Sequence, residues 1–129
     1  MKIILASKSG VRKNILDKNG FETTVSPSNV DEDQVKEALI QKGAGPEIIS
    51  KNLAELKSIK VGTKFPDQLV LGADSVISLD SKLINKPTSR KDALDILKLL
   101  NGQKHYLISS VCISKNSSMI WNYTDKSEL

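Results

Sequence analysis

The amino-acid sequence predicts a fold that mixes helices with a mixed β-sheet, of either the α/β or the α+β class. Short apolar runs bounded by turn residues alternate with longer segments whose apolar residues recur at helical spacing. Turn signals between some short runs indicate hairpins, which argue against a purely parallel, doubly wound sheet. The chain has 129 residues, the size of one domain, so a single domain over 1–129 is expected.

The first part of the chain is predicted to run strand, helix, strand. The apolar run 2–6 leads into the polar turn 7–10, which indicates a buried strand followed by a loop. Apolar residues at roughly helical spacing then predict a helix that stops at Asn19-Gly20. The alternating segment 21–25 predicts a second strand, which the turn 26–28 closes.

Two helices are predicted next. Asp31, Glu32 and Asp33 suit the first turn of a helix, where carboxylates meet the positive end of the helix dipole. A Gly-rich break ends in Pro46, which suits the first turn of the following helix. Apolar residues recur at helical spacing after Pro46, which predicts that this second helix extends to about Val61.

The middle of the chain is predicted to hold a central strand and a hairpin. The run 69–73 is almost continuously apolar, which predicts a strand buried on both faces, and Asp74 follows it directly. Asp80-Ser81 indicates a turn into a short return strand at 83–84.

The last part is predicted to be one helix and two strands. Ser89 suits the N-cap of a helix over 89–100, whose leucines form one apolar face. Strands are expected at 106–113 and 119–123, around a polar turn. The residues 124–129 are expected to begin another element.

Composition narrows the class of function. Apolar residues make up 39% of the chain, charged residues 26% and aromatic residues 4%, which indicates a folded chain without a base-stacking surface. The net charge is +4, and lysines are spread among acids rather than clustered, so nucleic acid is not expected as a partner. A small anionic substrate fits this balance better.

Cys112 and His105 are the chain's single cysteine and histidine. A single cysteine cannot form a disulfide within the chain. A Cys/His zinc site needs about four ligands, and one cysteine and one histidine cannot supply them. Cys112 lies in an apolar run and is interpreted as a buried core residue. His105 suits general acid–base chemistry, although a strand-edge position explains it more simply. No apolar run is long enough for a membrane span, and a cytoplasmic protein without membrane contact is expected.

Four features can carry chemistry, and each also has a structural interpretation. Two hydroxyls and a guanidinium at the first strand-to-helix turn, Ser7, Ser9 and Arg12, suit an anion site, but a serine also caps helices. Asp74 suits a catalytic carboxylate at a strand end, or a turn residue.

The acidic triplet at 31–33 offers oxygen ligands for Mg²⁺ or Mn²⁺, or simply charge at a helix start. The pair Lys57 and Lys86 suits phosphate binding, although most lysines are solvated surface groups.

Together these features resemble the Maf family of nucleoside triphosphate pyrophosphatases. The matching segments are Leu-Ala-Ser-Lys-Ser-Gly-Val-Arg at 5–12, Asp-Glu at 31–32, Leu-Ala-Glu-Leu-Lys-Ser at 53–58, Leu-Gly-Ala-Asp-Ser at 71–75, Lys-Pro at 86–87 and Leu-Asn-Gly-Gln-Lys-His at 100–105. Gly10-Val11 departs from the usual Pro-Arg of the family. The family continues beyond 129 residues, so the chain resembles its amino-terminal part.

The resemblance implies an α/β fold with a mixed central sheet flanked by helices, similar to inosine triphosphatase and incomplete at the carboxyl terminus. It implies hydrolysis of (d)NTPs, non-standard or modified ones above all, to NMP and pyrophosphate with Mg²⁺ or Mn²⁺. Asp74 is then the catalytic base, and Glu32 and Asp74 hold the metal. The substrate-binding residues are Ser7, Ser9, Arg12, Lys57 and Lys86.

Two other classes stay open at this point. A catalytically inactive Maf fragment would at most bind nucleotide, and an exposed sheet edge near Trp121 would favour a homodimer. A nucleic-acid or division-associated binding protein would need a steep salt dependence of DNA binding, which is not expected.

Overall fold

The computed structural model describes residues 1–84 and 87–129. The described part holds six strands and four helices, and every strand and helix predicted above is present. The strands are β1 (Lys2–Leu5), β2 (Glu22–Val25), β3 (Val70–Leu79), β4 (Lys82–Ile84), β5 (His105–Lys115) and β6 (Ser118–Glu128). The helices are α1 (Gly10–Lys18), α2 (Glu32–Gln41), α3 (Pro46–Gly62) and α4 (Arg90–Leu100).

All six strands belong to one mixed sheet in the order β2-β1-β3-β5-β6, with β4 paired to β3. The strands β1, β2 and the start of β3 are parallel, whereas β3, β5 and β6 form an antiparallel meander. β1 pairs with β3 as far as Leu71, and β4 pairs with β3 from Ile77 onward. Asp74 therefore lies on β3 between the two segments that pair with β1 and β4.

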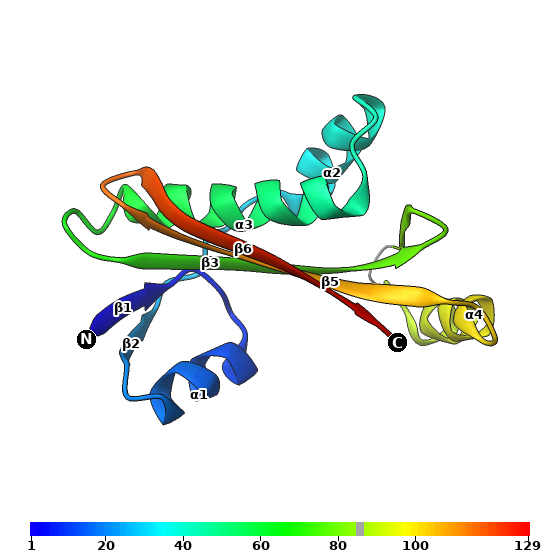
Figure 1. Cartoon of the computed structure of the whole chain (residues 1–129), viewed down its shortest axis with the longest axis horizontal. Helices are drawn as coiled ribbons and strands as arrows, with labels where there is room; N and C mark the ends of the chain where they lie inside the picture. Colours follow the sequence, from blue (N-terminus) through cyan, green and yellow to red (C-terminus); the bar gives the residue numbers. More distant parts are fainter. Residues whose placement is uncertain (85–86) are drawn as a thin grey trace.

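The helices cover the two sides of this sheet. Figure 1 shows α2 and α3 on one side of the long strands and α1 on the other, with α4 at the far end of β5. α3 packs closely on β3 at Gly72, where a Cβ atom would lie 2.1 Å from the carbonyl oxygen of Ala54. Only a glycine permits this approach, so Gly72 fixes how near α3 lies to the strand that carries Asp74.

Local chemistry explains where the helices begin. Ser9, Asp31 and Ser89 are N-caps whose side chains accept a hydrogen bond from the backbone N–H three residues on. At the β3–β4 turn, Asp80 and Ser81 have φ angles of +51° and +62°, the left-handed values that a two-residue hairpin requires.

Two predicted boundaries were wrong. β3 does not end before Asp74 but continues through it to Leu79, because Asp74 pairs with Ser110 of β5 and contacts α3. The residues 124–129 do not begin another element, because β6 runs to Glu128 along β5. The polar side chains of this edge strand lie largely in solvent, so its sequence lacks the alternation of a half-buried strand.

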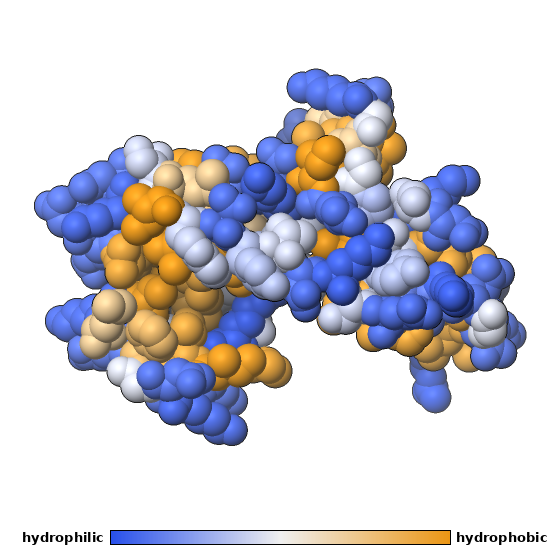
Figure 2. Space-filling model, viewed as in Figure 1, coloured by the Kyte–Doolittle hydropathy of each residue, from blue (hydrophilic) through white to orange (hydrophobic). Residues whose placement is uncertain are grey.

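Several large apolar side chains remain exposed. They include Met119, Ile120, Trp121 and Tyr123 of β6 and Leu94 and Leu97 of α4. Figure 2 shows apolar and polar side chains interspersed over this face of the molecule. No helix in the described ranges 1–84 and 87–129 has the length and apolar character needed to cross a membrane.

Candidate functional site

The loop between β1 and α1 gathers hydrogen-bond donors at the start of a helix. The hydroxyl of Ser9 accepts a hydrogen bond from the backbone N–H of Arg12 at 3.2 Å. The hydroxyl of Ser7 accepts one from the Ser9 backbone N–H at 3.1 Å and another from Nη1 of Arg12 at 3.0 Å. Arg12 is thereby held over the helix N-terminus, and this group of donors suits an anion such as phosphate.

These residues line a pocket of about 370 Å³ that we call the phosphate pocket. Its walls come from Ser7, Ser9 and Arg12, from Glu32 at the start of α2, from Lys57 of α3 and from the loop 27–30 after β2. Three segments distant in the sequence therefore meet here and bring hydroxyls, cations and a carboxylate to one pocket.

Lys57 joins the phosphate pocket to the interior of the protein. Its Nζ atom lies 3.3 Å from Oδ1 of Asp74 and donates a hydrogen bond at 3.3 Å to the carbonyl oxygen of Ala73. The same Nζ forms an ion pair with Oε1 of Glu32. The side chains of Lys57 and Asp74 are 10% and 2% exposed, so this ion pair is nearly removed from water. One ammonium therefore brings two carboxylates from different elements together.

The position of Asp74 follows from the packing of α3. The close approach at Gly72 brings the helix against β3, and the hydroxyl of Ser50 donates a hydrogen bond at 3.3 Å to the backbone carbonyl of Asp74. Burial raises the pKa of Asp74, and the charge and hydrogen bond of Lys57 oppose that rise. The second carboxylate oxygen, Oδ2, is buried and has no hydrogen-bond partner among the described residues.

Two carboxylates of the site could hold a divalent metal ion. Asp74 Oδ2 has an unused lone pair, and Glu32 and Asp74 converge on one point. No group of three His, Cys, Asp or Glu side chains suited to a metal occurs in the described part of the chain. Mg²⁺ is commonly held by one or two carboxylates, with phosphate oxygens and water completing its shell, so two carboxylates suffice.

Five of the predicted site residues line the phosphate pocket, namely Ser7, Ser9, Arg12, Glu32 and Lys57. Asp74 lies behind them and reaches the pocket through Lys57. Lys86 lies outside the described residues.

The remaining candidates lie elsewhere. His105 begins β5, and its Nδ1 is 3.0 Å from the carbonyl oxygen of Gln103, which agrees with a strand-end position. Cys112 is buried in the core as predicted, and burial raises the pKa of its thiol.

Sequence reasoning missed two contributors to this region. One is the loop 27–30, which lines the pocket, whereas the sequence indicates only a turn at 26–28. The other is Lys36 of α2, which is only 6% exposed. Its spacing from Asp33 and Ile40 places the three on one helix face, but two of these three residues are charged, so the sequence did not indicate that Lys36 is buried.

Comparisons with known proteins identify the family of the chain. The family model of Maf-like proteins matches residues 2–129. A Pelagibacter ubique protein named nucleoside triphosphate pyrophosphatase is 62% identical over 128 residues, covering 99% of this chain and 66% of that protein. A Rhizobium etli protein named 7-methyl-GTP pyrophosphatase is 32% identical over 128 residues, covering 99% of this chain and 64% of that protein. The chain thus spans about two thirds of the length of these curated relatives.

A solved structure confirms the fold. The Ham1 protein of Staphylococcus aureus superposes with a TM-score of 0.60 at 15% identity, covering 100% of this chain and 70% of that protein. The predicted α/β fold with a mixed central sheet flanked by helices is therefore correct. Because the family match extends from residue 2 to residue 129, the chain belongs to the family of Maf-like proteins.

Proposed function

We propose that this chain is a nucleoside triphosphate pyrophosphatase, which hydrolyses (d)NTPs, non-standard or modified ones among them, to NMP and pyrophosphate. The observation that carries the proposal is the convergence of Glu32 and Asp74 on Lys57 beside a pocket lined by Ser7, Ser9 and Arg12. The names of the Pelagibacter and Rhizobium relatives support the same chemistry.

The phosphate pocket supplies binding and charge neutralisation. Ser7, Ser9 and the backbone N–H groups at the start of α1 donate hydrogen bonds to phosphate oxygens. Arg12 presents a planar fork that matches a phosphate group, and Lys57 adds a point charge. We assign Lys86 the same role. These groups stabilise the negative charge that builds on the leaving pyrophosphate.

Glu32 and Asp74 are proposed to hold a Mg²⁺ or Mn²⁺ ion. When bound, such an ion polarises the phosphoryl oxygens that it contacts and neutralises their charge. Glu32 and Asp74, which Lys57 pairs with in this structure, would be the residues that hold such an ion, and Lys57 would contact phosphate oxygens.

Asp74 is proposed to accept the proton of the attacking water. Water adds to the α-phosphorus, the bond from that phosphorus to the bridging oxygen of the β-phosphate breaks, and pyrophosphate leaves. One water proton goes to Asp74 as the new P–O bond forms. A carboxylate whose pKa is raised by burial is a stronger base than one in water, which suits this step.

The isotope pattern of the products tests the reaction directly. The chain is incubated with GTP and Mg²⁺ in water enriched in ¹⁸O, and the products are separated and weighed by mass spectrometry. Label in GMP, with unlabelled pyrophosphate, is expected for attack at the α-phosphorus. GDP with phosphate as products, or labelled pyrophosphate, would contradict the proposal. EDTA is expected to stop the reaction.

The alternative of an inactive nucleotide-binding fragment makes an opposite prediction. It requires nucleotide binding with no product release for any nucleotide in a panel of standard and modified triphosphates. We favour an active pyrophosphatase over an inactive fragment because the carboxylate pair, its cation and the phosphate donors are all present within the described residues.

We also propose that the chain acts in the cytoplasm and forms a homodimer. Its single, free cysteine and its nucleotide substrate support the cytoplasm. The exposed apolar side chains of the edge strand β6, with Trp121 stacked on Tyr123, support self-association. Sedimentation velocity is expected to show a dimer that Trp121→Lys dissociates, and a monomer at all concentrations would contradict it.

A further inference from the structure

The loop 27–30 forms one wall of the phosphate pocket. Its two ends are fixed by the elements beside it. Before the loop, the backbone N–H of Ser26 donates a hydrogen bond at 2.9 Å to the carbonyl oxygen of Leu5 in β1. After the loop, Asp31 caps α2 by accepting a hydrogen bond at 3.1 Å from the backbone N–H of Gln34. The course of the loop between these two ends decides where the wall of the pocket lies.

Lys60 of α3 is bonded to the middle of this loop. Its Nζ atom donates a hydrogen bond at 3.0 Å to the backbone carbonyl oxygen of Asn29. Of the hydrogen bonds recorded among residues 1–84 and 87–129, this one alone involves the loop 27–30. The attachment of the loop to α3 by hydrogen bonding therefore depends on Lys60.

Asn29 has a backbone conformation that benefits from such a bond. Its φ angle is +52°, in the left-handed region. Residues with a side chain rarely adopt this region, although asparagine does so more readily than most. An untethered loop would therefore have other backbone conformations open to it, and the hydrogen bond from Lys60 favours the one in the structure over those others.

Two lysines of α3 contact the same short segment of the chain. Lys57 and Lys60 are three residues apart and therefore share a face of the helix. Lys57 pairs with the carboxylate of Glu32, and Lys60 bonds to the carbonyl of Asn29. α3 thus contacts both ends of the segment 29–32, one at the proposed metal ligand and the other at the pocket wall.

We infer that Lys60 is a positioning residue, which orders the loop 27–30 before the triphosphate binds. The inference rests on the proposed function for the ligand of the phosphate pocket. Lys60 is not among the described residues that line this pocket, so it acts through the loop. A loop that is already ordered loses less conformational freedom when the ligand arrives, and the ligand therefore binds more tightly.

Backbone ¹⁵N relaxation of the full chain without nucleotide tests the ordering itself. In the wild type, the order parameters of Ser28, Asn29 and Val30 are expected near about 0.85, the value of rigid backbone. In Lys60→Met they are expected to fall below about 0.6, the range of flexible backbone. Lys51→Met removes the same charge from an exposed position of α3 and is expected to match the wild type. Equal order parameters in Lys60→Met and the wild type would overturn the inference.

Calorimetry with α,β-methylene-GTP, a non-hydrolysable analogue, and Mg²⁺ tests the effect on binding. Lys60→Met is expected to raise the dissociation constant about threefold to tenfold, as the loss of one hydrogen bond does, whereas Lys51→Met retains the wild-type value. Lys60→Arg keeps a charged donor and is expected to bind like the wild type. Wild-type affinity in Lys60→Met, equal weakening in Lys51→Met, or a Lys60→Arg variant as weak as Lys60→Met would each contradict the role of Lys60.

Steady-state kinetics with GTP separate this inference from the proposed function. Lys60→Met is expected to raise KM and to leave kcat unchanged, because the bound ligand orders the loop in either case. A fall in kcat at unchanged KM, or pyrophosphate release with a wild-type KM, refutes the positioning role and leaves the activity standing. A mobile loop and weaker analogue binding in Lys60→Met, without hydrolysis by the wild type, support the positioning role and refute the activity. Failure of the wild type to bind the analogue contradicts both.

Discussion

The ammonium of Lys57 lies 3.3 Å from Oδ1 of Asp74, with both side chains nearly buried. The same ammonium pairs with Glu32 of α2. A single cation thus links a central strand and two helices, and it holds two carboxylates close together. This arrangement lets the fold keep like charges adjacent, because the ammonium offsets the repulsion between them.

Replacing Lys57 is expected to destabilise the chain because Asp74 then remains buried without its partner. Breaking a buried ion pair from one side costs about 3–5 kcal/mol in the free energy of unfolding. Urea unfolding of Lys57→Met, compared with Lys51→Met on the exposed side of α3, measures the difference. The double variant Lys57→Met, Asp74→Asn is expected to recover part of the loss. Strict additivity of the two single changes would contradict the coupling.

Gly72→Ala is expected to destabilise the protein by about 3 kcal/mol or more, at or above the upper end of the usual cost of a small-to-large change. Its Cβ would fall 2.1 Å from the Ala54 oxygen and 2.7 Å from the Ser58 nitrogen, both backbone atoms. Gly62→Ala is the matched control, since the nearest atom there is the Ser114 hydroxyl oxygen at 3.6 Å. If urea midpoints showed the two variants equally stable, the close packing of α3 on β3 would be wrong.

The raised pKa of Asp74 gives a pH dependence of stability for the chain without metal or nucleotide. Burial holds this pKa above its ordinary value of 3.8, so the folded chain keeps a proton that the unfolded chain has lost. The contribution of Asp74 to stability is therefore fully present below the unfolded pKa and is lost as pH rises through the folded pKa.

The Asp74→Asn substitution removes the titrating carboxyl group. The free energy of unfolding of Asp74→Asn minus that of the wild type is therefore expected to increase as pH rises from 3.8 upward. Urea unfolding in EDTA at a series of pH values measures it, and Asp80→Asn in the exposed β3–β4 turn serves as the control. A difference that falls with rising pH would show that the pKa of Asp74 is lowered.

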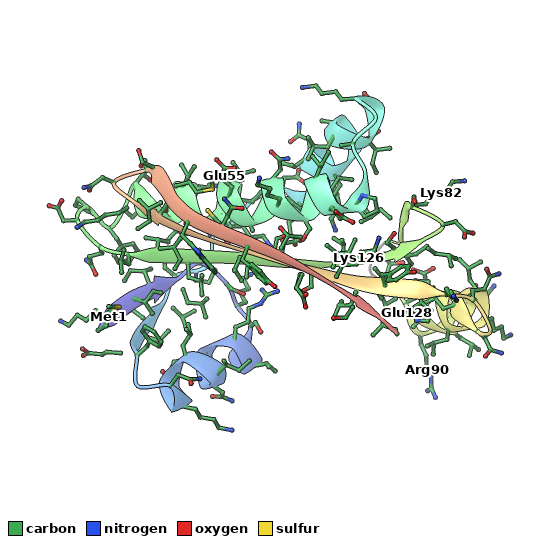
Figure 3. All side chains as sticks on the ribbon, in the orientation of Figure 1. Met1, Glu55, Lys82, Arg90, Lys126 and Glu128 are labelled. Atoms are coloured by element: carbon green, nitrogen blue, oxygen red, sulfur yellow. The ribbon has the colours of Figure 1, made fainter. Side chains whose placement is uncertain are left out.

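Arg12 is expected to contribute to nucleotide binding through its guanidinium. Arg12→Ala removes a charged donor from the phosphate pocket, and the dissociation constant for a triphosphate is expected to rise about tenfold or more. Arg90, the other arginine of the chain, projects away from the body at α4 and is the control (Figure 3). Calorimetry that finds the two variants alike would remove Arg12 from the site.

The local features of the fold were predictable from the sequence because they depend on neighbours in the chain. Ser9, Asp31 and Ser89 cap their helices as the sequence suggests. The strand boundaries at Asp74 and Thr124 were not predictable in this way. A polar residue continues a strand only when partners elsewhere in the sequence pair with it, as Ser110 does for both.

The candidate site was predictable in its residue types but not in its geometry. The spacing of Ser7, Ser9 and Arg12 already suggested an anion site at a helix start. The link from Lys57 to Glu32 and Asp74 depends on how α2, α3 and β3 pack, to which Gly72 contributes. The burial of Lys36 also arises only in the folded chain, since exposed and buried lysines look alike in a sequence.

The most direct test of the account is the rate of pyrophosphate release from a triphosphate with Mg²⁺ by the wild type, Asp74→Asn and Asp80→Asn. Asp74→Asn is expected to lower kcat by about 100-fold or more while the fold is retained, because the proton acceptor is lost. Asp80→Asn is expected to match the wild type. An Asp74→Asn variant that releases pyrophosphate at the wild-type rate would contradict the central claim that this buried carboxylate performs the chemistry.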